Sequence, residues 1–301
     1  MKSVLALLGL TLLLSSCTPA PATTAPPDVD TGVDPEAWAL VPAGEFLSGQ
    51  FNHEAELAYD YEIMVTDVTN RQFADYLNEA LAAGQIKIQD NFVVGFYPGD
   101  EFRGYRHEEE IAAGDWLHLP LEDASLRIIW QDDLFSVIEG YENHPVVMVS
   151  WFGAQAYCEY YGGRLPTSLE WEKAARGIDG RAYPWGNEIQ GENANYYGSH
   201  DPFEENYGKS GDTTPVGFYS GITFRNYTTL DSPSPYGLYD MAGNVEQWMG
   251  DVYANQHYRY LRGGSKLSYG FDLRVWSSNN VRPDYYSPSI GFRCARDPLE
   301  Q

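Results

Sequence analysis

Residues 144–177 read HPVVMVSWFGAQAYCEYYGGRLPTSLEWEKAARG, and they contain the clearest secondary-structure signals of the 301-residue chain. Ser150 is a suitable helix N-cap, and apolar residues follow it at helical spacing. These apolar residues are Ala154, Tyr157, Cys158 and Tyr161. Thr167 and Glu170 form a capping box at the start of a second helix, and Gly177 is placed to end that helix. The stretch therefore predicts two capped helices, with GGRLP leading into the second.

A third helix is predicted upstream, in the segment TNRQFADYL. Thr69 and Gln72 repeat the capping box, and Phe73, Tyr76 and Leu77 then share one helical face. Downstream of the three helices the chain offers short strands and long glycine-rich loops, without an internal repeat. The sequence therefore mixes few helices with many short strands.

The region from about residue 80 to residue 141 shows only weak alternation of apolar and polar residues. We interpret it as an insertion. The segment RIIWQDDLFSV at 127–137 has two apolar runs around a pair of aspartates, which predicts a β-hairpin within the insertion.

The chain is strongly acidic, with 43 Asp and Glu residues against 19 Lys and Arg residues and a formal net charge of −24. This balance argues against nucleic acid as a partner, because the phosphate backbone requires basic side chains. Electrostatic docking on anionic lipid is disfavoured for the same reason. The 23 tyrosines and 8 tryptophans supply a core, so the chain is not a disordered acidic segment.

The N-terminus has the features of an export signal. Lys2 precedes the apolar run VLALLGLTLLL, which is too short to span a bilayer comfortably. The following LSSC resembles the lipobox of bacterial lipoproteins, in which the cysteine, here Cys17, is acylated and becomes the new N-terminus. An ordinary signal peptide with an incidental cysteine is the alternative. Thr18 rather than Asp follows Cys17, so we expect an extracytoplasmic protein anchored to a bacterial membrane, the outer one in a Gram-negative cell.

Three regions follow from these features. Residues 1–17 are predicted to be the lipoprotein signal peptide. Residues 18–37 are rich in Pro and Thr and are predicted to form an extended tether. The folded domain is predicted to occupy residues 38–301, beginning near Trp38, with the insertion at about 80–141.

The remaining two cysteines, Cys158 and Cys294, are expected to form a disulfide. An oxidising compartment and an even number of thiols make that the default, and two buried free thiols are the alternative.

Six motifs occur in order between Trp38 and Asp297. They are TDVTNRQFADYLN, the 144–177 stretch, YPWGNE, SPYGLYDMAGNVEQW, RGGS and SIGFRCARD. Together they resemble the formylglycine-generating enzyme family, also called the sulfatase-modifying factor domain. The resemblance implies a single, loop-rich α+β domain, distantly like C-type lectins, with little regular secondary structure. It also implies the same bridge between Cys158 and Cys294.

The resemblance further implies calcium in the loop YDMAGNVEQW. The positions that match the family's ligands are the Asp240 side chain, the Gly243 and Val245 carbonyls, and Gln247, where the family usually has Glu. Calcium prefers such oxygen ligands, and an ordinary turn before a strand is the alternative. A second family calcium site matches Asn195 and the Tyr196 carbonyl, with Asp212 as the nearest candidate carboxylate.

The family's copper(I) site is not expected here. In the oxidases, two cysteines a few residues beyond RGGS bind copper(I) and activate oxygen, but residues 262–276 read RGGSKLSYGFDLRVW. Ser268 falls where the first cysteine would be, and a soft ion such as copper(I) requires thiolates. The six histidines are scattered without metal-site spacing. We expect a groove that serves binding, lined by Tyr269, Phe271 and Trp276, with ordinary core packing as the alternative for each.

Two functions are therefore compatible with the sequence. The favoured one is a lipid-anchored envelope protein that binds or scaffolds a peptide, glycan or protein partner, without copper oxidase activity. The alternative is an oxidoreductase of the same family that uses a different metal or ligand set on a protein or small-molecule substrate. Fold resemblance alone does not decide between them.

Overall fold

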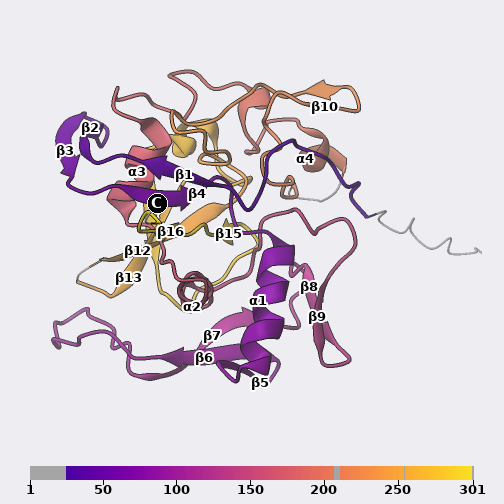
Figure 1. Cartoon of the computed structure of the whole chain (residues 1–301), viewed down its shortest axis with the longest axis vertical. Helices are drawn as coiled ribbons and strands as arrows, with labels where there is room; N and C mark the ends of the chain where they lie inside the picture. The colour runs from indigo at the N-terminus through magenta and orange to yellow at the C-terminus, as the bar shows by residue number, and fades with distance from the viewer. Residues whose placement is uncertain (1–24, 207–210, 254, 300–301) are drawn as a thin grey trace, which may run out of the picture.

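The computed structural model describes residues 25–206, 211–253 and 255–299, and Figure 1 shows their arrangement. Cys17 and the predicted signal peptide lie outside the described residues. The helices are α1 (Asn70–Ala82), α2 (Trp151–Tyr160), α3 (Ser168–Arg176) and α4 (Pro202–Asn206), with 3-10 turns η1 (Gly191–Asn193) and η2 (Gly270–Leu273). The chain is a mixed, loop-rich α+β domain, as predicted. Within the described residues, none of the helices combines the length and the apolar character needed to cross a membrane.

Two sheets lie at the centre of the domain, and the first of them connects its start to its end. A three-stranded antiparallel sheet has the order β1-β4-β16, so that the first strand and the last strand share a neighbour. Its strands are β1 (Trp38–Val41), β4 (Tyr61–Met64) and β16 (Ala295–Arg296). A four-stranded sheet has the order β14-β13-β12-β15, in which only the β12–β15 pair is parallel. Its strands are β12 (Glu246–Tyr253), β13 (Tyr258–Arg262), β14 (Ser278–Val281) and β15 (Ile290–Gly291).

The remaining strands form small units around this centre. Hairpins pair β2 (Gly44–Ser48) with β3 (His53–Leu57) and β10 (Thr223–Phe224) with β11 (Tyr227–Thr228). In Figure 1, β2 and β3 lie at the same end as α3, whereas β10 lies near α4.

The region from residue 80 to residue 141 packs on the domain rather than projecting from it. A three-stranded sheet of β5 (Ile86–Gln89), β6 (Phe92–Tyr97) and β7 (Gly114–Pro120) lies beside α1 and α2 in Figure 1. The predicted hairpin is present as β8 (Ile128–Gln131) and β9 (Leu134–Val137). Trp116 stacks on Phe152 of α2 with ring centroids 4.7 Å apart. This region therefore supplies part of the main hydrophobic core.

The three predicted helix starts are confirmed. Thr69 and Thr167 each accept a hydrogen bond from the backbone N–H three residues on, and the capping box is complete in both helices. Ser150 caps α2 through the Gly153 N–H, and Gly177 caps the end of α3 with a positive φ of 69°. The boundaries of these helices thus coincide with capping signals in the local sequence.

The part of the predicted tether that is described lies against the domain. The Thr31 hydroxyl donates to the Val216 carbonyl at 3.1 Å, and the Ser220 hydroxyl donates to the Thr31 carbonyl at 2.7 Å. Val29 packs on a small aromatic cluster that contains Phe218. From Val29 to the start of β1, therefore, the chain follows the surface instead of extending freely.

The predicted disulfide is present. Cys158 on α2 is bonded to Cys294 next to β16, and the two Cα atoms are 5.6 Å apart. Both cysteines are almost completely buried within the main core. The bridge joins the second helix to the end of the domain.

Candidate functional site

The segment that follows RGGS borders a cavity of about 320 Å³. Its lining residues are Glu246, Arg262, Gly264, Ser268, Asp272, Ser277, Ser278 and Asn279. We call it the Ser268 pocket. Ser268 is the residue that stands, by count from RGGS, where the family resemblance places the first copper-binding cysteine. The pocket therefore occupies the position where the family's reactive centre was expected.

Two glycines with left-handed backbone shape the turn that carries Ser268. Gly263 and Gly264 have φ of 90° and 65°, a region that L side chains rarely adopt. A Cβ on Gly264 would also lie 3.3 Å from the Ser268 hydroxyl. That hydroxyl accepts a hydrogen bond from the Ser265 N–H at 3.0 Å. The RGGS motif thus forms a tight turn, and this turn holds Ser268 at the pocket wall.

The charged groups of the pocket are mainly acidic. Burial raises the pKa of Glu246 to about 7, and the nearby charge of Asp272 acts in the same direction. Arg262 is the cation in the lining, but its guanidinium is already engaged. It donates to the Ser168 hydroxyl at 2.7 Å and lies 3.4 Å from a Glu172 oxygen. The pocket therefore presents two carboxylates and several small hydroxyl groups to a ligand.

An exposed aromatic surface adjoins the pocket in sequence and in space. Tyr269 precedes the η2 turn and Phe271 lies within it beside Asp272, and their rings are stacked with centroids 5.9 Å apart. Tyr197 meets Tyr269 edge-on at 5.2 Å. The exposed fractions of Tyr197, Tyr269 and Phe271 are 57, 56 and 58%. We call these three residues the aromatic platform, and its exposure makes it a candidate contact surface.

The third predicted groove residue, Trp276, lies elsewhere. Its ring is partly buried against the second core cluster, which contains Trp171 and Met249. The Arg176 guanidinium carbon lies 5.5 Å from its ring centroid. Trp276 is thus a packing residue, the alternative that was left open for it.

The described part of the chain offers no free thiol and no metal cluster. Both of its cysteines are in the disulfide. Within the described residues, no group of three or more His, Cys, Asp or Glu side chains is placed to hold a metal ion. The pocket accordingly has no thiolate for copper(I).

The predicted calcium loop has some oxygen atoms that suit a hard cation. Asp240 Oδ2 accepts from the Gly217 N–H at 2.6 Å, and its other carboxylate oxygen has no hydrogen bond in the described structure. The loop and side-chain hydrogen bonds among the described residues likewise leave the Gly243 and Val245 carbonyls without a donor. These three oxygens fit the chemistry of calcium.

The side chain of Gln247 does not fit as a ligand in this arrangement. Its Oε1 accepts from Trp171 Nε1 at 2.7 Å and from Arg293 Nε at 2.8 Å, and its Nε2 donates to the Asp240 carbonyl at 2.8 Å. Because these hydrogen bonds already occupy the amide oxygen and nitrogen of Gln247, the side chain is not available to coordinate a cation.

The second predicted calcium site lacks a carboxylate. Asn195 Nδ2 donates to the Asp212 carbonyl at 2.8 Å, not to its side chain. The Asp212 carboxylate instead accepts from the Tyr141 hydroxyl at 2.6 Å and lies 3.3 Å from Arg127 Nη2. The Tyr196 carbonyl accepts from a loop N–H at 2.9 Å. The structure therefore does not bring the charge of Asp212 to Asn195.

The sequence analysis missed Glu246 and Asp272. Glu246 begins β12, and Asp272 lies in η2, so neither belongs to a recognisable acid–base spacing. The available signal was that both fall inside motif segments already singled out, NVEQW and the segment after RGGS.

Known proteins resemble this chain over most of its length. A family model described as "Sulfatase-modifying factor enzyme 1-like domain" matches residues 24–298. "Inactive C-alpha-formylglycine-generating enzyme 2" of Mus musculus is 41% identical over 284 residues, covering 86% of this chain and 85% of that protein. "Formylglycine-generating enzyme" of Mus musculus is 32% identical over 256 residues, covering 77% and 65%.

A solved structure agrees at the level of the fold. PvdO from Pseudomonas aeruginosa has a TM-score of 0.55 with 21% sequence identity, and the match covers 87% of this chain and 94% of that one. The family match spans the helices, both central sheets and the Ser268 pocket. The chain is therefore a member of the sulfatase-modifying factor enzyme 1-like domain family, to which the formylglycine-generating enzymes belong.

Proposed function

We propose that this protein is a lipid-anchored binding protein of the bacterial cell envelope, which holds a segment of another polypeptide in the Ser268 pocket without oxidising it. The observation that carries the proposal is the hydroxyl of Ser268 at the position of the expected thiol. A hydroxyl does not replace a thiolate as a ligand for copper(I). Moving the register does not help, because residues 262–276 contain no cysteine.

A polypeptide is favoured as the ligand for two reasons. Formylglycine is an amino-acid residue, so the relatives named as formylglycine-generating enzymes act on a polypeptide. The pocket also suits one, because two carboxylates accept hydrogen bonds from main-chain N–H groups and donor side chains, while the aromatic platform packs against the rest of the segment. The relative named as an inactive formylglycine-generating enzyme agrees with retention of the fold without the chemistry.

The envelope location rests on the sequence features at Cys17 and at the apolar run before it. An anchored protein with an acidic domain would meet other exported polypeptides at the membrane surface. Calcium belongs to the same proposal as a structural ion in the Asp240 loop, where it would hold the loop and take no part in chemistry.

A first experiment tests catalysis. The full chain is loaded with copper and incubated with a peptide containing Cys-x-Pro-x-Arg, and the peptide is examined by mass spectrometry. We expect no loss of the thiol. Turnover would overturn the proposal in favour of an oxidoreductase with a different ligand set.

Binding of the same peptide, with its cysteine replaced by serine, is then measured by fluorescence anisotropy. Asp272→Asn and Tyr269→Ala should each weaken binding several-fold, by about 1 kcal/mol or more. Tyr105→Ala is the matched control, because Tyr105 is 58% exposed and lies far along the chain in the 80–141 region. Equal binding by all variants, or binding of a glycan in place of the peptide, would overturn the assignment of the pocket to a polypeptide.

A further inference from the structure

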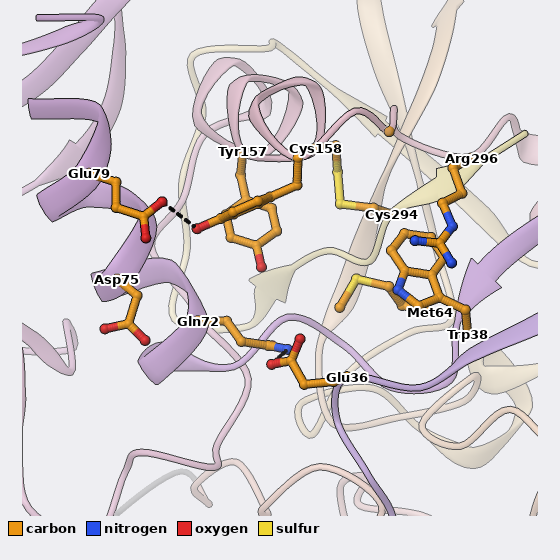
Figure 2. Close-up of a pocket in the computed structure, with 12 residues that line it drawn as sticks. Glu36, Trp38, Met64, Gln72, Asp75, Glu79, Tyr157, Cys158, Cys294 and Arg296 are labelled. Carbon is orange, nitrogen blue, oxygen red and sulfur yellow. Dashed lines mark hydrogen bonds between the residues drawn. A yellow bond between two sulfur atoms is a disulfide. The ribbon is translucent and has the colours of Figure 1, made fainter. Parts of the chain in front are cut away.

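A second and larger pocket lies beside the disulfide, and Figure 2 shows it. Its volume is about 420 Å³, and it is bounded by α1, α2, the segment before β1 and the last strand. Its lining residues are Glu36, Trp38, Met64, Gln72, Asp75, Glu79, Tyr157, Cys158, Tyr161, Gly163, Cys294 and Arg296. We call it the Tyr157 pocket. None of these residues lines the Ser268 pocket.

The walls of the Tyr157 pocket are apolar and aromatic. Met64 and the two bridged cysteines are almost fully buried, and the rings of Trp38 and Tyr161 are partly exposed to the pocket side of the molecule. Such walls suit an aliphatic stem or a cation that contacts aromatic faces.

Three carboxylates lie around these walls. Asp75 and Glu79 are one turn apart on α1, and Glu36 faces them from the segment before β1 (Figure 2). Glu36 accepts from Gln72 Nε2 at 2.7 Å, and Glu79 accepts from the Tyr161 hydroxyl at 3.3 Å. In the described part of the chain, none of the three has a basic side chain within ion-pair distance.

The basic residue in the lining does not neutralise these acids. Arg296 Nε donates to a Glu62 oxygen at 2.7 Å, and the guanidinium carbon stands 4.0 Å from the Trp38 ring centroid. Its charge is thus balanced by Glu62, outside the pocket lining. The pocket is left with a net negative charge.

Tyr157 adds an observation that is independent of the acids. Its side chain is only 5% exposed, yet its hydroxyl makes no hydrogen bond with any described residue. Figure 2 shows this hydroxyl projecting away from α2 into the pocket, on the side of Gln72 and Glu36. Burial, with the neighbouring tyrosine and carboxylates, raises the pKa of the Tyr157 phenol, so the group is a neutral hydroxyl. The hydroxyl is not among the described polar atoms that are closed off without a partner, so it opens onto the pocket and is available to hydrogen-bond a ligand there.

We propose that the Tyr157 pocket binds an alkylammonium group, supplied either by a free diamine or by a lysine side chain of another polypeptide. The ammonium N–H groups would donate to the Tyr157 oxygen and to the carboxylates of Asp75, Glu79 or Glu36. The methylene stem would lie along Met64 and the aromatic rings. An anion would be repelled by the three carboxylates, and no group of three metal-ligating side chains is assembled within the described residues.

Isothermal titration of the full chain with 1,5-diaminopentane tests the proposal directly. We expect saturable binding that weakens as salt is added, because the carboxylates are near the surface. Tyr157→Phe removes only the hydroxyl and should weaken binding about fivefold. The double variant Asp75→Asn, Glu79→Gln should weaken it about tenfold or more.

The matched control is the double variant Glu45→Gln, Glu54→Gln. It removes the same number of charges from exposed positions of the β2–β3 hairpin and should leave binding unchanged. Pentan-1-ol, which has the stem without the charge, should not bind. The proposal is overturned if the diamine binds more weakly than about 10 mM, or if the Asp75 and Glu79 double variant binds it as well as the control does.

Two further comparisons identify the source of the group and separate this proposal from the proposed function. N-acetyl-lysine-N-methylamide replaces the diamine in a second titration. Tighter binding of the lysine derivative assigns the pocket to a polypeptide, and tighter binding of the diamine assigns it to a free amine.

Asp272→Asn should leave diamine binding unchanged, whereas Tyr157→Phe should leave binding of the Cys-x-Pro-x-Arg peptide unchanged. Loss of diamine binding in Asp272→Asn would overturn the assignment to the Tyr157 pocket.

Discussion

The guanidinium Nε of Arg293 donates a 2.8 Å hydrogen bond to the amide oxygen of Gln247, and both side chains are completely buried. The same oxygen accepts from Trp171, and the Gln247 NH₂ group donates to the Asp240 carbonyl. Arg293 also lies 3.2 Å from a carboxylate oxygen of Asp67. These contacts fix which end of the amide is oxygen and which is nitrogen, since two donors face one end and a carbonyl faces the other.

Replacing Gln247 by Glu should make the stability of the domain depend on calcium. A carboxylate cannot donate to the Asp240 carbonyl, so two oxygens would face each other in a buried site unless a cation lies between them. We expect Gln247→Glu to melt at a lower temperature than wild type in chelator and to recover most of the difference in millimolar calcium. Gln85→Glu, at an exposed position, is the control. Melting curves of Gln247→Glu that are the same with and without calcium would contradict this account.

Calcium should also raise the melting temperature of the wild-type protein through the Asp240 loop. A ligand that binds only the folded state stabilises it by mass action, by about 2.7 kcal/mol at a hundredfold excess over its Kd. Differential scanning calorimetry with and without chelator measures the effect. In Asp240→Ala, most of the calcium-dependent rise in melting temperature should be lost, even if the variant melts at a different temperature from wild type without calcium. If wild type and Asp240→Ala respond alike, the ion does not bind in this loop.

Removing the disulfide should lower stability substantially. Cys158 and Cys294 are 136 residues apart in sequence, and closing so long a loop restricts the unfolded chain by about 5 kcal/mol in the chain-entropy model. We expect denaturant unfolding of Cys158→Ser, Cys294→Ser to show a loss of that order. Mass analysis of unreduced wild-type peptides should find the two segments linked. Two alkylatable thiols in exported protein would refute the bridge.

His118 should make the domain less stable in acid. Burial lowers the pKa of His118 from 6.5 to about 4, and its Nδ1 has no hydrogen-bond partner among the described residues. As the pH falls, the unfolded chain takes up the proton before the folded chain does. The free energy of unfolding is therefore unaffected by His118 above pH 6.5, and it decreases as the pH falls from 6.5 towards 4. The loss attributable to His118 should reach about 2 kcal/mol at pH 5.

His118→Gln should therefore lose less stability than wild type between pH 7 and pH 5 in denaturant titrations. The exposed His53→Gln serves as the control, and it should follow wild type. Parallel curves for wild type and His118→Gln across this range would show that His118 does not titrate in the predicted window.

Cys17→Ala should release the protein from membranes. Without the acylated cysteine the apolar run would act as an ordinary leader, and among the described residues no helix is long and apolar enough to hold the protein in a membrane. Cell fractionation followed by immunoblotting measures the distribution. A variant that still sediments with membranes would show that the lipobox interpretation is wrong.

The helices could be predicted from the sequence because their signals are local. Thr69 and Thr167 lie within one turn of the groups they cap, so no distant contact alters them. Trp276 shows the opposite case, because its burial depends on Arg176, which is distant in sequence. The cysteine bridge could be expected because only two candidates remained.

The two pockets could not be derived in the same way. Glu246 and Asp272 come together because β12 begins beside η2, and no sequence spacing encodes that. The Tyr157 pocket joins Glu36 to Arg296, from opposite ends of the domain, with α1 and α2 between them. Tyr157 itself was read as one residue of an apolar face, which describes its ring but not its unpartnered hydroxyl.

The contact between Trp38 and Arg296 has a consequence for how the domain could be re-engineered. These residues stand in the first and last strands, and β4 lies between those strands. A short linker could therefore join Asp297 to Trp38, with new termini opened at the Asp132–Asp133 turn between β8 and β9, and every strand would keep its neighbours. A circular permutant of this kind should fold around the same core. In topological terms the order of structural elements is circular, because the first and last strands meet on β4, and the positions of the chain ends within that circle could be changed.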